Sequence, residues 1–571
     1  MNKYTHALVV LLAAALAGCQ VITPRADQSA PAVAPPASDL PAADLTPDVL
    51  FQLLVGEIAG HRGDFGVSVG ALGRAAQKTR DPRLAERAAL AALYSRQSKE
   101  ALANASLWVE LRPASIEAHE ALAAALMENG EHDQAFGEFE RMLTLAGEGG
   151  LPQAYLRISA TLGRQADRGA ALATMHKLVA LHPGKAVAHY ALAHLAVRVG
   201  DLDAAMTAID RSLALNPSWE DAALFKARVL VSRKDMNQVL RYYEDYLDDY
   251  PRASTMRLGY ARLLVDLKQW DRAREQFKRV VAASPQDADA AFTVALLAMQ
   301  VDDLGEAEKY LLRTLELQPD NDQARLYLGQ LAEQRKRYDD AIQWYGEIES
   351  DEYRFEAQAR LGVVLANQGK LEQARAHLQA LEPKTEAQRV QLALAEEQIL
   401  RDARRFTEGF DVLTAALGEL PNNTDLLYAR ALVAEKLDRI DVAEKDLRRI
   451  LKRDPKNANA LNALGYTLAD RTTRYKEALG FIEQALALKP DDPFILDSMG
   501  WVQYRLGNHA EAVKHLRAAL GQRADAEIAA HLGEVLWVMG DRAGAETVWT
   551  SALKQSPDSE VLRGVIKRFK P

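Results

Sequence analysis

Cysteine is almost absent from this chain: Cys19 is the only one in 571 residues. A lone cysteine cannot close an intramolecular disulfide, even in an oxidising compartment. Long apolar runs are also missing, and no later segment is expected to span a bilayer. The formal net charge is −9. This acidic balance argues against nucleic acid as a partner, because neutralising phosphates requires clustered lysine and arginine.

Signals for catalysis and for metal or cofactor binding are weak as well. No glycine-rich phosphate loop occurs in the sequence. Ser68 stands in a G-x-S-x-G string, but the surrounding pattern is helical and offers no strand before the serine. His189 and His194 are five residues apart, which places them on different faces of a helix, whereas a shared metal needs a spacing of three or four. We therefore expect no enzyme activity, no metal, no cofactor and no small-molecule substrate.

A strict period is the strongest positive feature of the sequence. Five prolines recur at intervals of 34 residues, namely Pro183, Pro217, Pro251, Pro285 and Pro319. Each interval contains two stretches with apolar residues at helical spacing, separated by a turn such as Gly200-Asp201. One such hairpin is smaller than the roughly 40 residues that a self-sufficient core needs, so neighbouring hairpins must stack. The period thus predicts an all-α repeat array.

Small residues keep the same phase inside each interval. Gly329 stands twelve residues before Ala341, and Gly533 stands twelve residues before Ala545. We expect each glycine and its alanine to lie where two antiparallel helices approach closely. A larger side chain at these places would overpack the hairpin.

These landmarks resemble the tetratricopeptide repeat, in which a leucine–glycine pair, alanines, an aromatic residue and a proline recur within 34 residues. The resemblance implies a right-handed superhelical solenoid of about fifteen helix-turn-helix units, which we place at residues 48–559. A capping helix is expected at 560–571. The pattern becomes irregular over 346–424, where Gly409 replaces an alanine, and we expect the curvature of the solenoid to change there.

The start of the chain is similar to a bacterial lipoprotein. Lys3 is followed by an apolar stretch too short to span a membrane, and Leu16-Ala17-Gly18 precedes Cys19. This string resembles a lipobox, which implies a signal peptide over 1–18 and a lipid on Cys19; the alternative is a signal peptide with an incidental cysteine. Gln20 favours the outer membrane. Residues 19–47 then provide a spacer rich in proline and alanine, so the repeats would face the periplasm and reach the membrane only through their lipid anchor.

A solenoid of this family presents a groove formed by the first helix of each unit, and such grooves hold peptides or proteins. The family places groove residues at the second, fifth, ninth, twelfth and thirteenth positions. Near the end of the chain these positions select Asn459, Asn462, Tyr466, Asp497, Trp501, Tyr504, Arg505 and Trp537. Aromatic residues and arginine are common at interface hot spots. Trp501 and Tyr504 could equally pack between neighbouring units.

The first helix after the spacer is a second candidate surface. Leu50, Phe51, Leu54 and Ile58 contribute to an apolar surface that exceeds one helix face. An end helix has a neighbour on one side only, so the surplus could bind a partner protein or pack against the hairpin at Leu84–Leu93. We favour the hairpin.

Two stretches narrow the resemblance: LLVGEIAGHRGD at 53–64 and LGYTLADRT at 464–472. Together with the lipobox they resemble the tetratricopeptide lipoproteins of pseudomonads, a group that includes the lipoprotein partner of a periplasmic carboxyl-terminal processing protease. The resemblance implies an adaptor that binds and activates this protease and presents protein substrates such as cell-wall hydrolases. The alternative is an assembly lipoprotein of an outer-membrane secretion, pilus or exopolysaccharide complex.

Overall fold

The computed structural model describes residues 45–570, and every regular element in this range is an α-helix. The chain divides after Tyr310 into two compact units. The first unit contains α2 (Pro47–His61), α3 (Phe65–Thr79), α4 (Pro82–Tyr94), α5 (Ser98–Leu111), α6 (Ile116–Glu128), α7 (His132–Leu162), α8 (Arg168–Leu181), α9 (Ala186–Val199), α10 (Leu202–Leu215), α11 (Glu220–Ser232), α12 (Met236–Asp249), α13 (Ser254–Asp266), α14 (Trp270–Ala283) and α15 (Ala288–Gln300).

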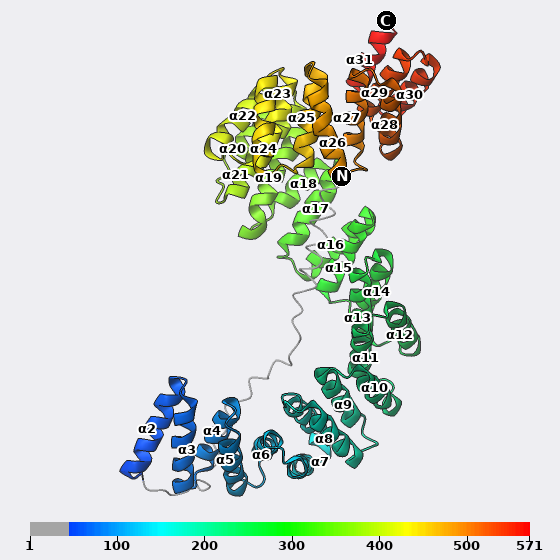
Figure 1. Ribbon diagram of the computed structural model, residues 1–571. Helices are drawn as coiled ribbons and strands as arrows, with labels where there is room; N and C mark the ends of the chain where they lie inside the picture. The colour runs from blue at the N-terminus through cyan, green and yellow to red at the C-terminus, as the bar shows by residue number, and fades with distance from the viewer. Residues whose placement is uncertain (1–44, 571) are drawn as a thin grey trace. The chain divides into compact units, whose positions relative to one another are not determined.

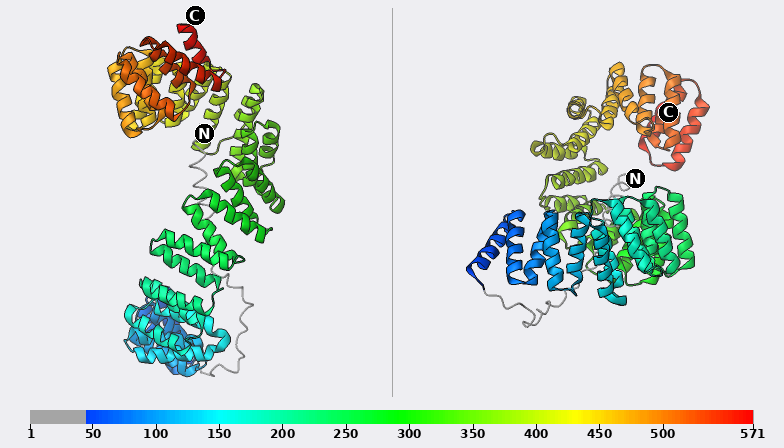
Figure 2. Two further views of the ribbon diagram at one scale, coloured as in Figure 1. Left: turned by 90° about the vertical axis from the view of Figure 1, so that its right-hand side faces the viewer. Right: turned by 60° about the horizontal axis from the view of Figure 1, so that its bottom comes forward.

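The division falls inside α16 (Leu304–Leu317). The second unit continues with α17 (Asp322–Gln334), α18 (Tyr338–Gly346), α19 (Asp351–Asn367), α20 (Leu371–Gln379), α21 (Glu386–Asp402), α22 (Phe406–Glu419), α23 (Thr424–Lys436), α24 (Ile440–Arg453), α25 (Ala458–Arg471), α26 (Tyr475–Leu488), α27 (Pro493–Arg505), α28 (His509–Gln522), α29 (Ala526–Val538), α30 (Arg542–Gln555) and α31 (Glu560–Phe569). In each unit successive helices stack side by side as hairpins (Figures 1 and 2).

The number of hairpins agrees with the sequence period. Gly147 has non-helical backbone angles, with φ 61° and ψ 178°, and divides α7 into the second helix of one hairpin and the first helix of the next. With α7 counted as two segments, the 30 described helices give fifteen hairpins and the terminal helix α31. The expected all-α array of about fifteen units is therefore confirmed.

The small residues lie where the two helices of a hairpin touch. A Cβ atom added to Gly329 would stand 2.3 Å from Cε1 of Tyr345, and one added to Gly533 would stand 2.0 Å from Nε1 of Trp549. Ala341 and Ala545, their partners in the period, are fully buried. The expected close approach is confirmed, and at these places the protein uses glycine to admit a large ring from the opposite helix.

Turns between helices follow local backbone chemistry. Gly200 adopts a left-handed conformation with φ 92° at the end of α9, which costs glycine little because it lacks a Cβ. Asp201 then caps α10, because its Oδ1 accepts a hydrogen bond from the backbone N–H of Ala204 at 2.9 Å. The Gly-Asp pair thus ends one helix and begins the next within two residues.

The period loosens in the second unit between α18 and α21. The second helices α18 and α20 have only 9 residues each, whereas the first helices α19 and α21 have 17. Regular hairpins in the same unit, such as α25 with α26, have two helices of 14 residues. In the hairpin α19–α20 length is thus redistributed between the two helices, whereas α21 is longer than usual and its partner α22 keeps 14 residues. The change of curvature expected over 346–424 stays a prediction.

Candidate protein-binding groove

A concave pocket lies on the groove side of the second unit, with a volume of about 280 Å³. First helices of consecutive repeats build it, with α23, α25 and α27 supplying most of the wall and α21, α22 and α29 contributing at the edges. Its lining residues are Arg401, Phe406, Tyr428, Leu432, Val433, Glu435, Lys436, Asn462, Ala463, Tyr466, Phe494, Asp497, Ser498 and Glu527. A pocket of mixed apolar and polar side chains in a groove is a natural place for part of a protein ligand.

Three of the groove residues selected from the sequence meet in this pocket. Asn462 and Tyr466 come from α25, and Asp497 comes from α27. They hold the fifth and ninth positions of one repeat and the fifth position of the next. The repeat phase therefore brought together residues that are 31 to 35 positions apart in the chain.

Three other selected residues take part in contacts between repeats. Trp501 is 7% exposed, and its ring stacks on His531 with the centroids 4.3 Å apart. The hydroxyl of Tyr504 donates to Glu534 at 3.2 Å. The guanidinium of Arg505 lies 5.0 Å from the centre of the Tyr475 ring.

The last two selected residues are also engaged within the chain. Asn459 accepts a hydrogen bond from the Lys489 ammonium at 3.1 Å. The ring of Trp537 lies 5.7 Å from that of Trp549 and 6.2 Å from that of Phe569, centre to centre. Phe569 is near the end of α31, so Trp537 helps to pack the terminal helix.

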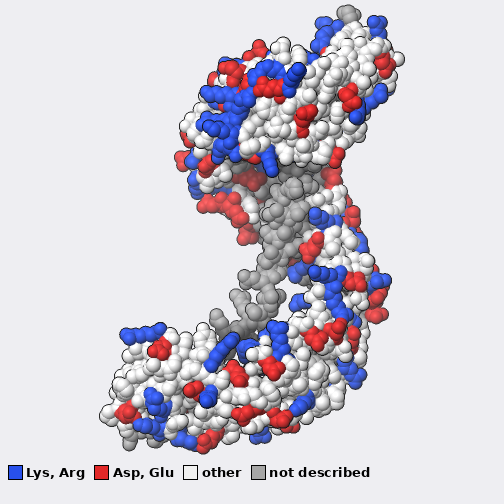
Figure 3. Space-filling view, in the orientation of Figure 1, with Lys and Arg blue, Asp and Glu red and all other residues white. Residues whose placement is uncertain are grey.

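Burial shifts the pKa values of side chains in the pocket. Charged side chains of both signs are scattered over the face shown in Figure 3, whereas Glu435 and Asp497 are only 8% and 7% exposed. Burial raises the pKa of Glu435, although Lys436 and Arg471 oppose this effect. The pKa of Tyr466 is raised well above its usual value by burial and then by four carboxylates, with Glu527 having the largest effect of the four.

Asp497 is held in place by a histidine that sequence reasoning missed. Nδ1 of His531 lies 3.0 Å from both carboxylate oxygens of Asp497. Because a carboxylate can only accept, Nδ1 carries the hydrogen. Burial lowers the pKa of His531, but the charge of Asp497 and its hydrogen bond outweigh burial, so the pKa is raised. Glu435 was missed too, although it is the twelfth residue of its repeat and the same positional rule selects it.

The second candidate surface, on α2, is exposed. Leu50, Phe51, Leu54 and Ile58 are between 43% and 60% exposed. They are spaced by one, four and eight residues, which places them on one side of the helix. The interpretation that the Leu84–Leu93 hairpin covers them is wrong.

Contacts between α2 and α3 explain this result. The opposite side of α2 packs on α3, where a Cβ on Gly56 would lie 2.7 Å from Cγ of Leu72. The hydroxyl of Ser68 donates to the carbonyl of Gly56 at 2.7 Å. Because α2 contacts its neighbour through the side that carries Gly56, the four large apolar side chains on the other side remain in solvent.

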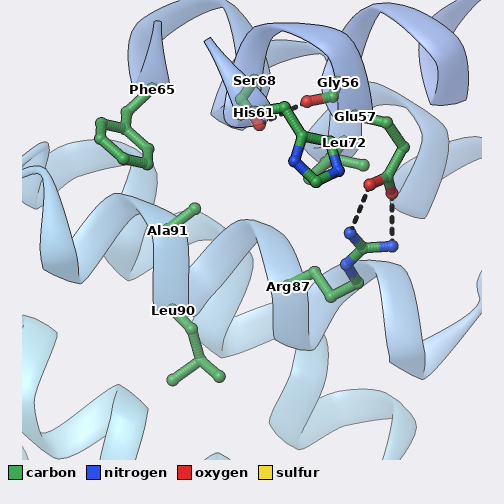
Figure 4. Close-up of a pocket in the computed structure, with 10 residues that line it drawn as sticks. Gly56, Glu57, His61, Phe65, Ser68, Leu72, Arg87, Leu90 and Ala91 are labelled. Carbon is green, nitrogen blue, oxygen red and sulfur yellow. Dashed lines mark hydrogen bonds and ion pairs between the residues drawn. The ribbon is translucent and has the colours of Figure 1, made fainter. Parts of the chain in front are cut away.

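A second pocket, of about 420 Å³, opens among α2, α3 and α4 (Figure 4). Phe65, Leu72 and Leu90 give it apolar walls. Arg87 of α4 reaches toward Glu57 of α2, and its Nη2 donates to Oε2 of Glu57 at 2.7 Å. Ser68 lies at this pocket, but it is 3% exposed, belongs to helix α3 and is engaged with Gly56. The strained turn after a strand that activates such serines is absent at Ser68.

The two histidines considered for a metal, His189 and His194, have other partners. His194 stacks on Phe225 with the ring centroids 3.9 Å apart, and His189 Nε2 lies 3.0 Å from the carbonyl of Pro183. Within residues 45–570 no three histidine, cysteine, aspartate or glutamate side chains are placed to share a metal ion. In the same range, none of the helices has the length and apolar character needed to cross a membrane.

Comparison with known proteins agrees with the fold. One tetratricopeptide repeat model matches residues 190–238, 293–353, 428–493 and 498–560, and a second model of that description matches 230–299. A TPR repeat-containing protein of Pseudomonas aeruginosa is 35% identical over 574 residues, covering 100% of this chain and 96% of that protein. The chain belongs to the tetratricopeptide repeat proteins.

Solved tetratricopeptide structures match shorter parts of the chain. A thermophilic TPR protein of Thermus thermophilus is 22% identical and covers 32% of this chain and 98% of its own, with a TM-score of 0.29. A tetratricopeptide repeat protein of Parabacteroides merdae is 15% identical and covers 50% of this chain and 100% of its own, with a TM-score of 0.34.

Membership of this family gives the groove a general role. Tetratricopeptide repeats are scaffolds for protein–protein interaction and typically have no catalytic function. The pocket on α23, α25 and α27 and the exposed side of α2 are therefore candidate contact surfaces for protein partners.

Proposed function

We propose that this tetratricopeptide protein is a lipid-anchored adaptor at the outer membrane, facing the periplasm. It binds and activates a carboxyl-terminal processing protease and presents protein substrates, such as cell-wall hydrolases, to that protease. The observation that carries the proposal is the exposed apolar side of α2. Fully burying one large apolar side chain is worth about 1.5–3 kcal/mol, and four such side chains gathered on one helix favour a protein partner.

The chain offers two separate kinds of contact surface, which is what an adaptor needs. The α2 surface is apolar, whereas the pocket in the second unit combines tyrosines with buried carboxylates. We assign the protease to α2 and the protein substrate to the groove. Holding both on one chain makes their encounter intramolecular, which can raise apparent affinity by about 10²–10⁴ without any new contact.

The anchor is part of the same proposal. Cys19 and the spacer at 19–47 lie outside the described residues apart from the last three positions of the spacer. Two or more acyl chains on Cys19 would hold the protein stably on the membrane, because each buried methylene contributes about 0.8 kcal/mol. We expect Cys19→Ser to move the protein from the membrane fraction to the soluble periplasmic fraction.

The docking assignment is tested with the full chain in detergent and the purified protease. The double substitution Phe51→Ser and Leu54→Ser removes two exposed apolar side chains of α2, and we expect it to weaken protease binding at least about tenfold and to abolish activation. The matched control is Leu181→Ser at the end of α8, because Leu181 is 39% exposed but lies outside the proposed surface.

A cross-linked purification of the chain from its own cell envelope decides between adaptor and assembly factor. An adaptor should bring down the protease together with accumulated substrates. Recovery of an outer-membrane channel or secretin without a protease would replace the proposal with an assembly role. Full activation by the α2 double variant would show that the protease docks elsewhere.

A further inference from the structure

The pocket in the second unit contains hydrogen-bond acceptors that the chain does not use. Oδ1 of Asn462 is buried and, within the described residues, has no donor. Glu435 accepts a hydrogen bond from the Thr467 hydroxyl at 3.3 Å. Glu435 forms no ion pair with a lysine, arginine or histidine of the described residues, although the charges of Lys436 and Arg471 act on its carboxylate. A buried carboxylate without a cation is energetically expensive.

Aromatic rings stand beside these acceptors. Tyr428 and Tyr466 line the same pocket as Glu435 and Asn462. The face of an aromatic ring attracts a cation within about 6 Å of its centre. One ring at the edge, Phe494, already has the guanidinium of Arg523 at 5.1 Å from its centre, so Phe406 and the two tyrosines are the rings left for a ligand.

Elsewhere in this unit an arginine fills the same kind of environment. The Nε and Nη2 atoms of Arg430 each donate to Asp446 at 2.8 Å, while its guanidinium lies 5.8 Å from the centre of the Phe410 ring. Arg505 combines a ring, Tyr475, with a carboxylate, Asp470, at 4.0 Å. The pocket has the ring and the buried carboxylate of Glu435, but none of its own arginines or lysines is paired with that carboxylate.

Two basic residues also line the pocket and oppose a cationic ligand. Arg401 and Lys436 are exposed at its edge. The guanidinium of Arg401 is 3.5 Å from the carboxylate of the neighbouring Glu397, so part of its charge is already balanced. Two carboxylates, those of Glu435 and Glu527, face these two cations, while the carboxylate of Asp497 is paired with His531. The buried carboxylates act more strongly than exposed charges because water screens them less.

We propose that this pocket binds a basic side chain, lysine or arginine, of the protein that occupies the groove. The cation would donate to Glu435 and to Oδ1 of Asn462 and lie against the rings of Tyr428 and Tyr466. A cavity of about 280 Å³ is below the size range typical of drug-sized ligand sites, and it suits one side chain. This assignment rests on the proposed function, since it specifies the chemistry of the substrate held in the groove.

Short peptides test the assignment with the full chain. The probe is a labelled peptide, acetyl-Gly-Ser-X-Ser-Gly-amide, in which X is lysine, arginine, citrulline, norleucine or glutamate. We expect lysine and arginine to bind about tenfold or more tightly than citrulline or norleucine, because hydrogen bonds to a charged group are the stronger ones. Equal binding of citrulline and arginine would overturn the proposal, and so would a preference for glutamate.

Two substitutions locate the binding in this pocket. Glu435→Gln keeps the shape but removes the charge, and we expect it to reduce binding of the lysine peptide about tenfold. The matched control is Glu396→Gln, because Glu396 is also buried, at 9% exposure, does not line the pocket, and contacts Arg375, which keeps Glu408 as a partner. Asn462→Asp adds a carboxylate where the unused acceptor stands, so it should strengthen binding. Unchanged affinity in both pocket variants would overturn the proposal.

The result is separable from that of the protease experiment. Protease binding is assigned to α2, so Glu435→Gln should leave it unchanged. If the chain binds lysine peptides but no protease, the adaptor role fails and the pocket assignment stands. If the chain activates the protease but does not distinguish lysine from norleucine, the pocket assignment fails and the adaptor role stands.

Discussion

A stacking contact between a histidine and an aromatic ring joins neighbouring repeats in both units. The pKa of the histidine is lowered in the first unit and raised in the second. In the first unit His194, the ninth residue of its repeat, stacks on Phe225, the sixth residue of the next repeat, with centroids 3.9 Å apart and an interplanar angle of 20°. In the second unit Trp501 occupies the ninth position and stacks on His531 at the sixth, at 4.3 Å and 25°. The stacking geometry is thus similar in both units, but the histidine is at the ninth position in the first unit and at the sixth position in the second.

The fifth position of the repeat makes the two contacts different. It is Tyr190 in the first unit, and the Tyr190 ring lies 4.5 Å from that of His194. It is Asp497 in the second unit, and its carboxylate lies 3.0 Å from His531. Burial, helped by Arg198 and Arg228, lowers the pKa of His194 to about 4.

The pKa of His531 is raised, even though burial opposes its charge, because the carboxylate of Asp497 favours the imidazolium. The fifth position therefore adds a neutral ring to one contact and a carboxylate to the other. The repeat fold fixes the stacking contact, whereas the charge of its histidine follows from burial, the nearby charged residues and the fifth-position residue together.

The largest effect should come from removing the carboxylate in the second unit. Asp497→Ala leaves His531 buried without its partner, and we expect a loss of roughly 3–5 kcal/mol in the stability of the surrounding repeats. The pKa of His531 should fall below its ordinary value. Denaturant unfolding followed by tryptophan fluorescence measures the first effect, and imidazole proton NMR measures the second. An unfolding midpoint equal to that of the unsubstituted protein would mean that the ion pair does not hold these repeats together.

The two histidines should also respond to pH in opposite directions. His194 has a folded-state pKa of about 4, below the unfolded value of about 6.5. Its contribution to stability is complete above pH 6.5 and is lost as the pH falls toward 4. The loss is up to about 3 kcal/mol, at 1.36 kcal/mol for each pH unit.

His531 behaves in the reverse sense, because its folded-state pKa is raised. Its contribution is present below pH 6.5 and is lost as the pH rises through its folded-state value. The free energy of unfolding is measured at several pH values for the unsubstituted chain and for His194→Gln. The difference between the two series isolates the acid-sensitive contribution of His194. A His194→Gln variant that remains as acid-sensitive as the unsubstituted chain would assign the loss to other groups.

A substitution at a small-residue position of the repeat should affect neither of the two histidine contacts. Ala307, in the first unit, is fully buried at a place where the period demands a small residue. Ala307→Leu should destabilise its hairpin by roughly 1–3 kcal/mol through overpacking and leave the pKa values of both histidines unchanged. Calorimetric melting and NMR titration measure the two expectations. An unchanged melting midpoint would show that the repeat phase is misplaced at this hairpin.

The sequence was sufficient to predict the array and part of the groove. A fixed interval of 34 residues assigns each position to a place on a hairpin, so Asn462, Tyr466 and Asp497 could be brought together without coordinates. It could not say which selected residues face solvent. The side chain at the ninth position of a repeat can face the groove or pack on the next repeat. The size of the side chain opposite it in the next repeat determines which of the two it does. Trp501 is buried because His531 offers it a flat partner, and no spacing rule contains that information.

The periodic pattern also could not predict local exceptions to the repeat. The apolar side of α2 was expected against the hairpin at Leu84–Leu93, but Gly56 lets α2 settle on α3 by its opposite side. Gly147 divides one apparent helix because its backbone reaches φ 61°, a conformation that glycine permits without requiring it. Such features depend on which of two packing arrangements is more stable, by a few kcal/mol. The apolar periodicity of the sequence is the same for both arrangements.

The smallest expected effect gives the most direct test of the comparison. Tyr190→Asp places at the fifth position of the first unit the residue type that the second unit has there. We expect the pKa of His194 to rise by about 1–2, because an opposite charge close to an imidazole favours its charged form. The neutral control Tyr190→Asn removes the same ring without adding charge, and imidazole NMR titration reads both variants. If the two variants give the same pKa for His194, the aspartate charge is not the cause, and the opposite behaviour of the two histidines must come from burial and the nearby arginines instead.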